Sequence, residues 1–472
     1  MMDCITQWIA LINDRFLGYL LMGGLLFCGI YFTFASRFVQ FVNPREMWRL
    51  LTRTSSYSKR KGHISSFQAF SISTASRVGT GNIAGVAIAI TTAGPGAIFW
   101  MWLIAVLGSA SAFVESTLAQ VYKVRKDSHF IGGPAYYMQT ALKKRWMAVS
   151  FAYLITITFA FVFNSVQANT IAQSLQTTFG ADLWATGAIL TVLTCLIIFG
   201  GLKRIAKFSA FIVPFFAFSY IAVTLLVVLL NMEKIPSVFE AIFSDAFSWR
   251  NAAGGALGAT IMTGARRGLF SNEAGMGSAP NAAATANISH PAKQGYVQAF
   301  SVFVDTLVIC SCTAFIVLLS DYHGFSATGI TLTQEALRQS VGGWGNYFIS
   351  FSVLLFAFTS IIGNYYYGQA NVQFLTKKRN AMLFFRSCVA LMVLFGSVVK
   401  MQLVWNLADL FMSLMALLNI AAIFMLRRQV LDVIADYRRQ RQAGTTDPVF
   451  KPSDIPSIQN ASAWEEQPHK DK

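Results

Sequence analysis

The sequence predicts an all-α protein that crosses a membrane many times. Of its 472 residues, 55% are hydrophobic and only 12% are charged, and the mean hydropathy is +0.51. A soluble domain carries about 25% charged residues. The charges are clustered, so apolar runs of about 18 or more residues recur, each long enough to cross about 30 Å of hydrocarbon. Several such helices in one chain indicate a membrane bundle.

The apolar runs predict eleven membrane-spanning helices. They lie at 16–36, 66–94, 97–122, 146–176, 182–200, 207–231, 252–286, 295–320, 344–372, 381–399 and 402–426. We expect residues 1–430 to form one membrane transport domain. The polar residues 431–472 are expected to form a short helix and a disordered tail, because such a segment buries little apolar surface.

Alternate loops between the spans are basic, which predicts the orientation of the chain. With an odd number of spans all of these loops lie on one side, and the positive-inside rule makes that side cytoplasmic. We therefore expect the N-terminus outside and the C-terminus in the cytoplasm. The basic residues are Arg37, Arg45, Arg49, Arg53, Lys59, Arg60, Lys61, Lys123, Arg125, Lys126, Lys143, Lys144, Arg145, Lys203, Arg204, Lys207, Lys377, Lys378, Arg379, Arg427 and Arg428.

The same loops account for the net charge of +16 without a nucleic-acid partner, since no basic stripe interleaved with aromatic residues is present. The six cysteines lie mostly within or beside apolar spans and form no C-x-x-C pair. A disulfide framework or a zinc site is therefore not expected.

Two spans are interrupted by residues that disfavour a membrane helix. Glycine and polar residues interrupt the second span at 73–82, and the seventh contains glycines and charges at 263–277. Glycine lowers helix stability by about 1 kcal/mol relative to alanine, and a charge at membrane depth costs about 2.5–3.5 kcal/mol. Such stretches persist where freed peptide groups face protein or a water-filled cavity.

The interrupted spans occupy corresponding places in two halves of the chain. When 16–36 is set aside as an extra helix, the halves are 66–231 and 252–426, each beginning with an interrupted span. Each half also has a short amphipathic piece, at 133–142 and at 331–341. Five spans per half make the two halves inverted repeats, and paired broken helices in inverted repeats mark a transporter binding site near the midplane.

An unwound helix offers both kinds of group that an amino acid needs. The half after the break exposes N–H groups and a positive dipole end, which suit a carboxylate. The half before it exposes carbonyls, which suit an ammonium group or sodium. Gly79 and Gly81 allow a ligand to approach the backbone. The alternative interpretation is that Gly81 and Gly85 only pack against a neighbouring helix.

Six motifs carry a family resemblance: GTGNIAGVA (79–87), GPGA (94–97), FWMW (99–102), GGPA (132–135), QAN (167–169) and FSNEAGMGS (270–278). Over about residues 16–430 the chain resembles the alanine/glycine:cation symporter family. The resemblance implies a leucine-transporter-like fold, alanine or glycine as substrate, sodium as the usual co-substrate, no cofactor, and the bacterial inner membrane as location.

The resemblance also implies the residues of the site. Those that would face or limit the substrate are Thr80, Gly81, Asn82, Phe270, Ser271, Asn272, Gly275 and Met276. Gln167 would line the site or form an interhelical hydrogen bond. The implied sodium ligands are the carbonyls of Ala75 and Val78 and the hydroxyls of Thr359 and Ser360. Arg77 departs from the small residue expected before the glycines.

Charges at membrane depth are candidates for gating or coupling. They are Glu273, Arg266, Arg267 and Asp305. Neither arginine is spaced to pair with Glu273 along one helix, because such pairs lie three or four residues apart. We therefore expect their partners on other helices, among Glu115, Asp305 and Asp409.

The predicted function is symport of alanine or glycine with sodium into the cell by alternating access, and proton coupling is the alternative. An ion channel is a different class, and the paired, inequivalent breaks argue against it. An enzyme is not expected, since the five histidines (His63, His129, His290, His323 and His469) lie outside the span centres. A nucleotide-driven pump is disfavoured, because it would need a G-x-x-x-x-G-K-[ST] loop and the sequence has none.

Overall fold

The computed structural model describes residues 2–42, 44–52, 64–126, 129–200, 202–248 and 256–465. The described residues form helices and one two-stranded antiparallel hairpin that pairs Val124 with Ile131. Residues 252–255 of the predicted seventh span, and Arg53, Lys59, Arg60 and Lys61 of the first basic loop, lie outside them.

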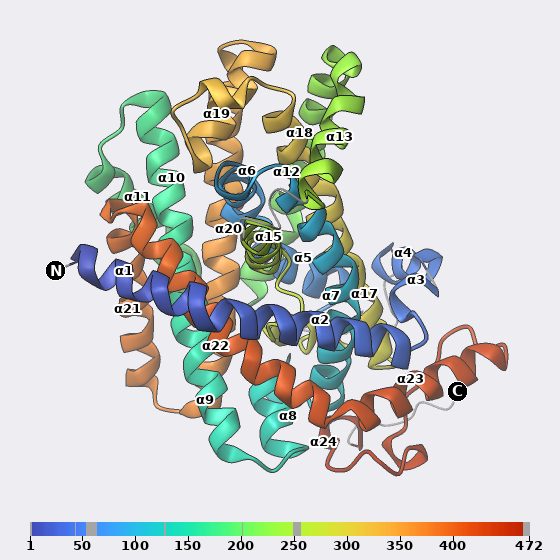
Figure 1. The fold of residues 1–472 in the computed structure, drawn as a ribbon. Helices are drawn as coiled ribbons and strands as arrows, with labels where there is room; N and C mark the ends of the chain where they lie inside the picture. The colour runs from blue at the N-terminus through green and yellow to red at the C-terminus, as the bar shows by residue number, and fades with distance from the viewer. Residues whose placement is uncertain are drawn as a thin grey trace.

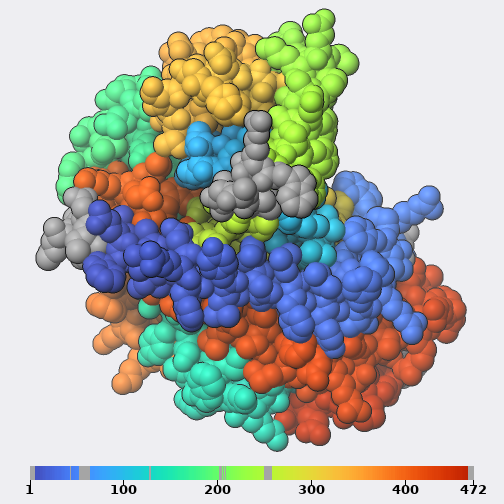
Figure 2. Space-filling model, viewed as in Figure 1, coloured from blue at the N-terminus to red at the C-terminus, as the bar shows by residue number. Residues whose placement is uncertain are grey.

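The chain begins with helices that lie across one face of the bundle, drawn in dark blue in Figures 1 and 2. They are α1 (Met2–Ile12), η1 (Asn13–Leu17), α2 (Gly18–Ala35), α3 (Val39–Val42) and α4 (Pro44–Thr52).

The first half contains α5 (Ser66–Arg77), η3 (Gly81–Gly85), α6 (Val86–Ala93), α7 (Gly96–Val121), β1 (Val124–Lys126), β2 (His129–Ile131), α8 (Pro134–Thr140), α9 (Arg145–Ile155), η4 (Thr156–Phe163), α10 (Asn164–Phe179), α11 (Leu183–Ile198) and α12 (Leu202–Leu230). Helix α5 begins at a capping box, in which Ser65 and Gln68 bind each other's backbone N–H.

The second half follows η5 (Met232–Lys234) and α13 (Ile235–Ala246). It contains α15 (Ala256–Asn272), α16 (Pro280–Ala283), α17 (Ala292–Val302), η6 (Phe303–Cys310), α18 (Ser311–Leu318), η7 (Tyr322–Gly324), α19 (Gly329–Val341), α20 (Trp344–Leu375), α21 (Arg379–Val398) and α22 (Met401–Met425). The C-terminal elements are α23 (Arg427–Gln442), η8 (Pro452–Asp454) and α24 (Ser462–Glu465).

Eight helices among the described residues are long and apolar enough to cross a membrane. They are Thr6–Ala35, Gly96–Val121, Arg145–Phe179, Ser209–Leu230, Ala292–Leu318, Trp344–Leu375, Arg379–Val398 and Met401–Met425. The other three predicted spans coincide with the broken helix α5–α6, with α11 and with α15. The crossing number of eleven and the inverted repeat stay predictions, whereas helices at both short amphipathic segments, α8 and α19, are confirmed.

The two broken helices lie at the centre of the bundle (Figure 1). Helix α5 ends at Arg77, Val78 is extended (φ −75°, ψ 93°), and the helix resumes at Gly81. Helix α15 ends at Asn272, and the chain then takes positive φ values at Glu273, Gly275 and Gly277. Both predicted breaks are therefore present.

The second break is shorter than predicted, because residues 263–272 are regular helix. Gly264 and Gly268 allow α15 to pack against α7. A Cβ atom on Gly264 would lie 2.6 Å from the Ala97 carbonyl oxygen and 2.7 Å from Trp100 Cβ. Gly264 is therefore needed for close packing, a Cβ atom on Gly268 would make an ordinary 3.4 Å contact with Met101, and neither glycine interrupts the helix.

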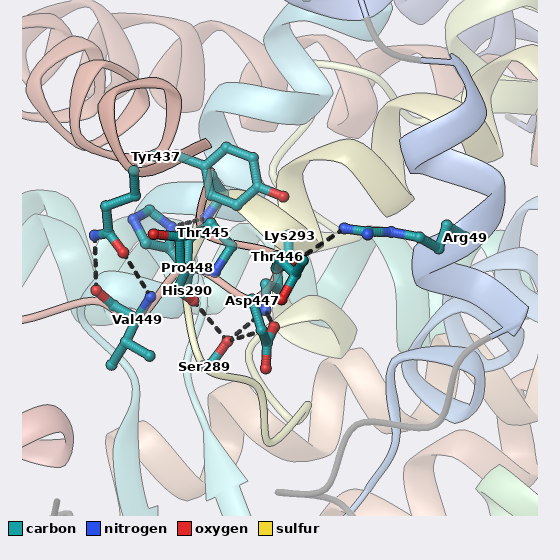
Figure 3. Close-up of polar contacts among 12 residues, drawn as sticks. Arg49, Ser289, His290, Lys293, Tyr437, Thr445, Thr446, Asp447, Pro448 and Val449 are labelled. Atoms are coloured by element: carbon teal, nitrogen blue, oxygen red, sulfur yellow. Dashed lines mark hydrogen bonds and ion pairs between the residues drawn. The ribbon is translucent and has the colours of Figure 1, made fainter. Parts of the chain in front are cut away.

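The prediction of a disordered tail is wrong for residues 443–465, which fold back onto the bundle (Figure 3). Phe450 N donates to the Ser289 carbonyl (2.9 Å), and Asp447 forms an ion pair with Lys293. Trp464 is buried and its Nε1 donates to the Gln120 carbonyl at 2.9 Å. A few apolar side chains thus anchor a segment whose average composition is polar.

His290 lies beneath this C-terminal segment, outside the spans. Its Nε2 is 3.3 Å from Asp436 Oδ2, and its ring packs edge-on against Tyr437 and Phe450. Burial lowers the pKa of His290 below the usual 6.5, and the hydrogen bond and charge of Asp436 only partly oppose this effect. The folded protein therefore holds His290 neutral at a pH where the unfolded chain protonates it.

We expect acid to destabilise the protein through His290. As the pH falls through about 6.5, the unfolded chain binds more protons than the folded protein, so the free energy of unfolding decreases. The unfolding temperature of purified protein should fall with pH in this range, and His290→Gln should flatten that dependence. His323→Gln, at an exposed position, is the matched control. Equal slopes of the unfolding temperature against pH for wild type and His290→Gln would contradict the assignment.

Candidate functional site

The peptide groups freed at the first break are bound by side-chain amides. Gly79 N donates to Asn82 Oδ1 at 3.0 Å, and Thr80 N donates to Gln167 Oε1 at 2.9 Å. All of these side chains are buried, and the Thr80 hydroxyl has no hydrogen-bond partner among the described residues. The oxygens of two side-chain amides therefore accept hydrogen bonds from N–H groups that could instead bind a substrate carboxylate.

Asn82 connects the first break to the second half of the chain. Its Nδ2 donates to Asp305 Oδ1 at 2.8 Å and to Ser271 Oγ at 3.0 Å. Ser271 Oγ in turn donates to Asp305 Oδ2 at 2.6 Å and lies 3.0 Å from Cys310 Sγ. These residues come from η3, α15 and η6, so three elements meet in one buried polar cluster.

Phe270 forms an aromatic wall beside this cluster. Its ring centroid lies 4.4 Å from that of Phe163 and 4.7 Å from that of Trp405. A Cβ atom on Gly81 would lie only 2.7 Å from Phe270 Cδ1. Gly81 is therefore required for the close approach of the broken helix to this wall.

Three of the four predicted sodium ligands lie together. Ser360 Oγ is 2.8 Å from the Ala75 carbonyl oxygen and 3.3 Å from that of Val78. Ser360 Oγ and Thr359 Oγ1 both also donate to the Phe356 carbonyl of their own helix, at 3.0 Å and 2.8 Å. Oxygen ligands suit a hard cation such as sodium. The described residues contain no group of three or more His, Cys, Asp or Glu that could hold a metal ion.

Glu273 ties the second break to the first. Its Oε1 accepts a hydrogen bond from Ser76 Oγ at 2.7 Å, and its Oε2 accepts one from Ser278 Oγ at 2.6 Å. Ser76 Oγ is also 2.6 Å from Asn364 Oδ1 of α20. The last turn of α5 and the unwound residues after α15 are therefore linked.

The other predicted residues of the second break have different surroundings. Gly275 N donates to Glu115 Oε1 at 3.3 Å, and Asn419 Nδ2 donates to the Gly275 carbonyl at 2.9 Å. Asn272 Nδ2 donates to Thr306 Oγ1 at 3.2 Å. Met276 is fully buried. The contacts of Gly275 join it to α7 and α22, away from the cluster around Asn82.

Arg77 is a buried cation at the end of α5, directly before the first break. Its three guanidinium nitrogens make no hydrogen bond to a described residue. Its charge acts on Glu115, Glu273 and Asp305. The charge of Arg77 therefore acts on carboxyl groups from three segments, which are α7, the residues after α15, and η6.

Arg267 covers the aromatic wall. Its guanidinium pairs with Asp409, with Nη2 2.5 Å from Oδ1, and lies 4.6 Å from the centre of the Trp405 ring. The predicted partner Asp409 is thus confirmed. Phe163, Phe270, Trp405 and Arg267 therefore contact one another in this order beside the first break.

Arg266 has a partner that the sequence analysis missed. Its Nη1 lies 2.6 Å from Asp14 Oδ1 of η1. The suggested partners Glu115 and Asp305 are wrong for both arginines, since Glu115 accepts from Gly275 and Asp305 accepts from Asn82 and Ser271.

Sequence reasoning also missed Trp405, Cys310, Ser76, Asn364 and Asn419. A signal existed for Trp405 alone, because it lies four residues before Asp409 and therefore on the same helix face. The other four are ordinary small or polar residues within spans, and only their neighbours reveal them.

The chain was compared with known proteins. Residues 2–452 match the sodium:alanine symporter family. The chain is 52% identical to the probable sodium/glutamine symporter GlnT of Bacillus subtilis, over 98% of this chain and 97% of that protein. It is 49% identical to the amino-acid carrier protein AlsT of the same organism, over 96% of each chain. A solved structure of a Na⁺-coupled sialic acid symporter superposes with a TM-score of 0.50 at 15% identity, covering 87% of this chain and 86% of that one, and so supports the fold. The protein therefore belongs to the sodium:alanine symporter family, a family of transporters and not of enzymes.

Proposed function

We propose that the protein carries alanine or glycine into the cell together with sodium, and that the substrate binds at the first break. The observation that supports this most is the buried cluster in which Asn82 links the broken helix to Ser271 and Asp305. The inner membrane of a bacterium, an outside N-terminus and a cytoplasmic C-terminus complete the proposal.

The cluster has the groups that an amino-acid zwitterion requires. The substrate carboxylate would take the N–H groups of Gly79 and Thr80, displacing the amide oxygens of Asn82 and Gln167. The ammonium group would be bound by acceptors such as the Asp305 carboxylate. Since Gly81 packs directly on Phe270, a small side chain fits this site best.

Sodium would bind at the same break, held by the carbonyls of Ala75 and Val78 and by Ser360. Because segment 75–82 would contact both solutes, each one orders the backbone that binds the other. An inward sodium ion gains about 2.3 kcal/mol for each 100 mV of membrane potential.

Glutamine is a second candidate substrate, because a relative with 52% identity is named a probable sodium/glutamine symporter. Proton coupling is the alternative for the cation. A channel is disfavoured, since the two breaks are inequivalent and Thr80, Asn82 and Ser271 are 0% exposed.

Asn82→Ala should abolish sodium-dependent uptake of labelled alanine by protein in liposomes. The substitution removes the oxygen that binds Gly79 N and the amide that binds Asp305, leaving buried polar groups without partners. Excess unlabelled glycine and glutamine, added separately, would identify the preferred substrate. Asn380→Ala, at an exposed position of α21, is the control. Full uptake by the Asn82 variant would exclude this site, and uptake unchanged by replacing sodium with choline would favour protons.

Ser360→Ala should raise the sodium concentration for half-maximal uptake about tenfold or more, since a lost contact to a charged group costs about 1.5–3 kcal/mol. Thr359→Val should have a smaller effect, because Ser360 Oγ reaches the Ala75 and Val78 carbonyls, whereas Thr359 Oγ1 bonds to the Phe356 carbonyl of its own helix. The sodium dependence of initial uptake rates provides the measurement. Equal increases of the half-maximal sodium concentration in both variants would indicate that Thr359 is also a sodium ligand.

Arg267→Gln and Asp409→Asn should each destabilise the protein by about 3–5 kcal/mol, because each leaves an uncompensated buried charge. The double variant should lose less unfolding free energy than the two single variants lose together. Thermal unfolding of the purified variants tests this. Arg338→Gln and Glu335→Gln, in an ion pair at the protein surface, are the control, and each should cost about 1 kcal/mol or less. Strict additivity would show that the two charges are not coupled.

A further inference from the structure

A cavity of about 1020 Å³ lies at the end of the bundle that carries the C-terminal segment, and the proposed transport does not use it. Four helices begin or end around it: α11, α20, α9 and α21. Strand β1 and helix α8 complete its wall, and α24 contacts β1. Figure 1 shows α8, α9 and α24 towards the same end of the molecule.

The cavity is lined by positive charge from both halves of the chain. Arg125, Lys126 and Arg145 of the first half form one side. None of its lining residues is an acid, and none of these three forms an ion pair with a described residue. Like charges around one cavity repel each other, so an anion bound between them would relieve that repulsion.

Lys377, Lys378 and Arg379 form the opposite side, also without an ion pair to a described residue. Helix α21 begins at Arg379, and the residue before it provides no side-chain cap. The first N–H groups of α21 therefore lack a capping side chain beside these three cations. A helix N-terminus with such groups binds phosphate well.

The cavity also has an apolar side. Phe199, directly after α11, and Leu383 of α21 line it, and they are 57% and 43% exposed. Arg386 lies between the two regions: its guanidinium is 4.9 Å from the Phe199 ring centre, and its Nε donates to Tyr365 OH at 2.9 Å. Exposed apolar residues continue along both helices at Leu196 and Leu391. The cavity thus passes from a cationic region to the apolar surface of two spans.

We propose that this cavity binds the phosphate headgroup of an anionic phospholipid, with the acyl chains lying along α11 and α21. Basic pockets between membrane helices on the cytoplasmic side are sites for such headgroups. Topology alone requires basic loops on this side, but it does not require two loops from different halves to face each other across a cavity with an apolar opening. The lipid would connect the first half to α20, which carries Ser360.

The test measures lipid retained by the purified full-length protein in detergent, by native mass spectrometry. Phosphatidylglycerol, phosphatidylcholine and inorganic phosphate are the separate probes. The triple variant Lys377→Gln/Lys378→Gln/Arg379→Gln removes the positive charge from one side of the cavity. Lys143→Gln/Arg428→Gln/Lys451→Gln removes the same charge from exposed positions outside it. Each basic residue near an anionic surface contributes about 1 kcal/mol, so three should change affinity by more than tenfold.

We expect phosphatidylglycerol to be retained in preference to phosphatidylcholine, and its affinity to fall at least about tenfold in the cavity variant but not in the control. Equal retention of the two lipids, or an equal loss in both triple variants, would overturn the proposal. Inorganic phosphate that displaces the lipid at equal concentration would also overturn it, in favour of a soluble anion. If the first variant does not fold, Arg125→Gln/Lys126→Gln on the opposite side gives the same test.

Discussion

The exclusion of water from the first break determines how this site is built. Two peptide N–H groups lose their helical partners there, and each would cost about 1–3 kcal/mol if it stayed buried without a hydrogen bond. Asn82 and Gln167 supply the missing acceptors. A side-chain amide can rotate away, whereas a helical carbonyl cannot. In the proposed transport, the same residues would satisfy the backbone without substrate and release it to a substrate carboxylate.

The second break depends on the first through charge. Glu273 accepts hydrogen bonds from Ser76 at the end of α5 and from Ser278 within its own loop. Arg77, the residue after Ser76, is a buried cation whose charge acts on Glu273 and Asp305. A displacement of α5 would therefore change the surroundings of Glu273 and Asp305 together. Cation binding beside Val78 would act on the same residues.

Much of this arrangement could be predicted from the sequence, because membrane depth makes unusual residues expensive. Gly79 and Gly81 marked the first break, and the need of Arg267 for a partner indicated Asp409. Gly264 and Gly268 were misleading, since a glycine that interrupts a helix and one that permits close packing look alike in a sequence. The distance from Gly264 to Ala97 distinguishes them.

Other features depended on contacts between distant segments. Asp14 pairs with Arg266 across 252 residues, and Trp464 reaches the end of α7 from the last described helix. Neither contact follows from local periodicity or from composition. The polar average of the C-terminal segment hid the few side chains that anchor it.

In the proposed transport, the ion pair of Arg267 and Asp409 beside the aromatic wall is a candidate gate. While Arg267 and Asp409 are buried, separating them costs several kcal/mol because neither charge is hydrated. An opening that admits water hydrates both charges as they part, and an ion pair exposed to water is worth about 1 kcal/mol or less. In the proposed transport, opening would also break the contact between Phe270 and Trp405, and substrate at the first break would lie beside that contact. The ion pair thus resists opening in the dry state and offers little resistance once water enters.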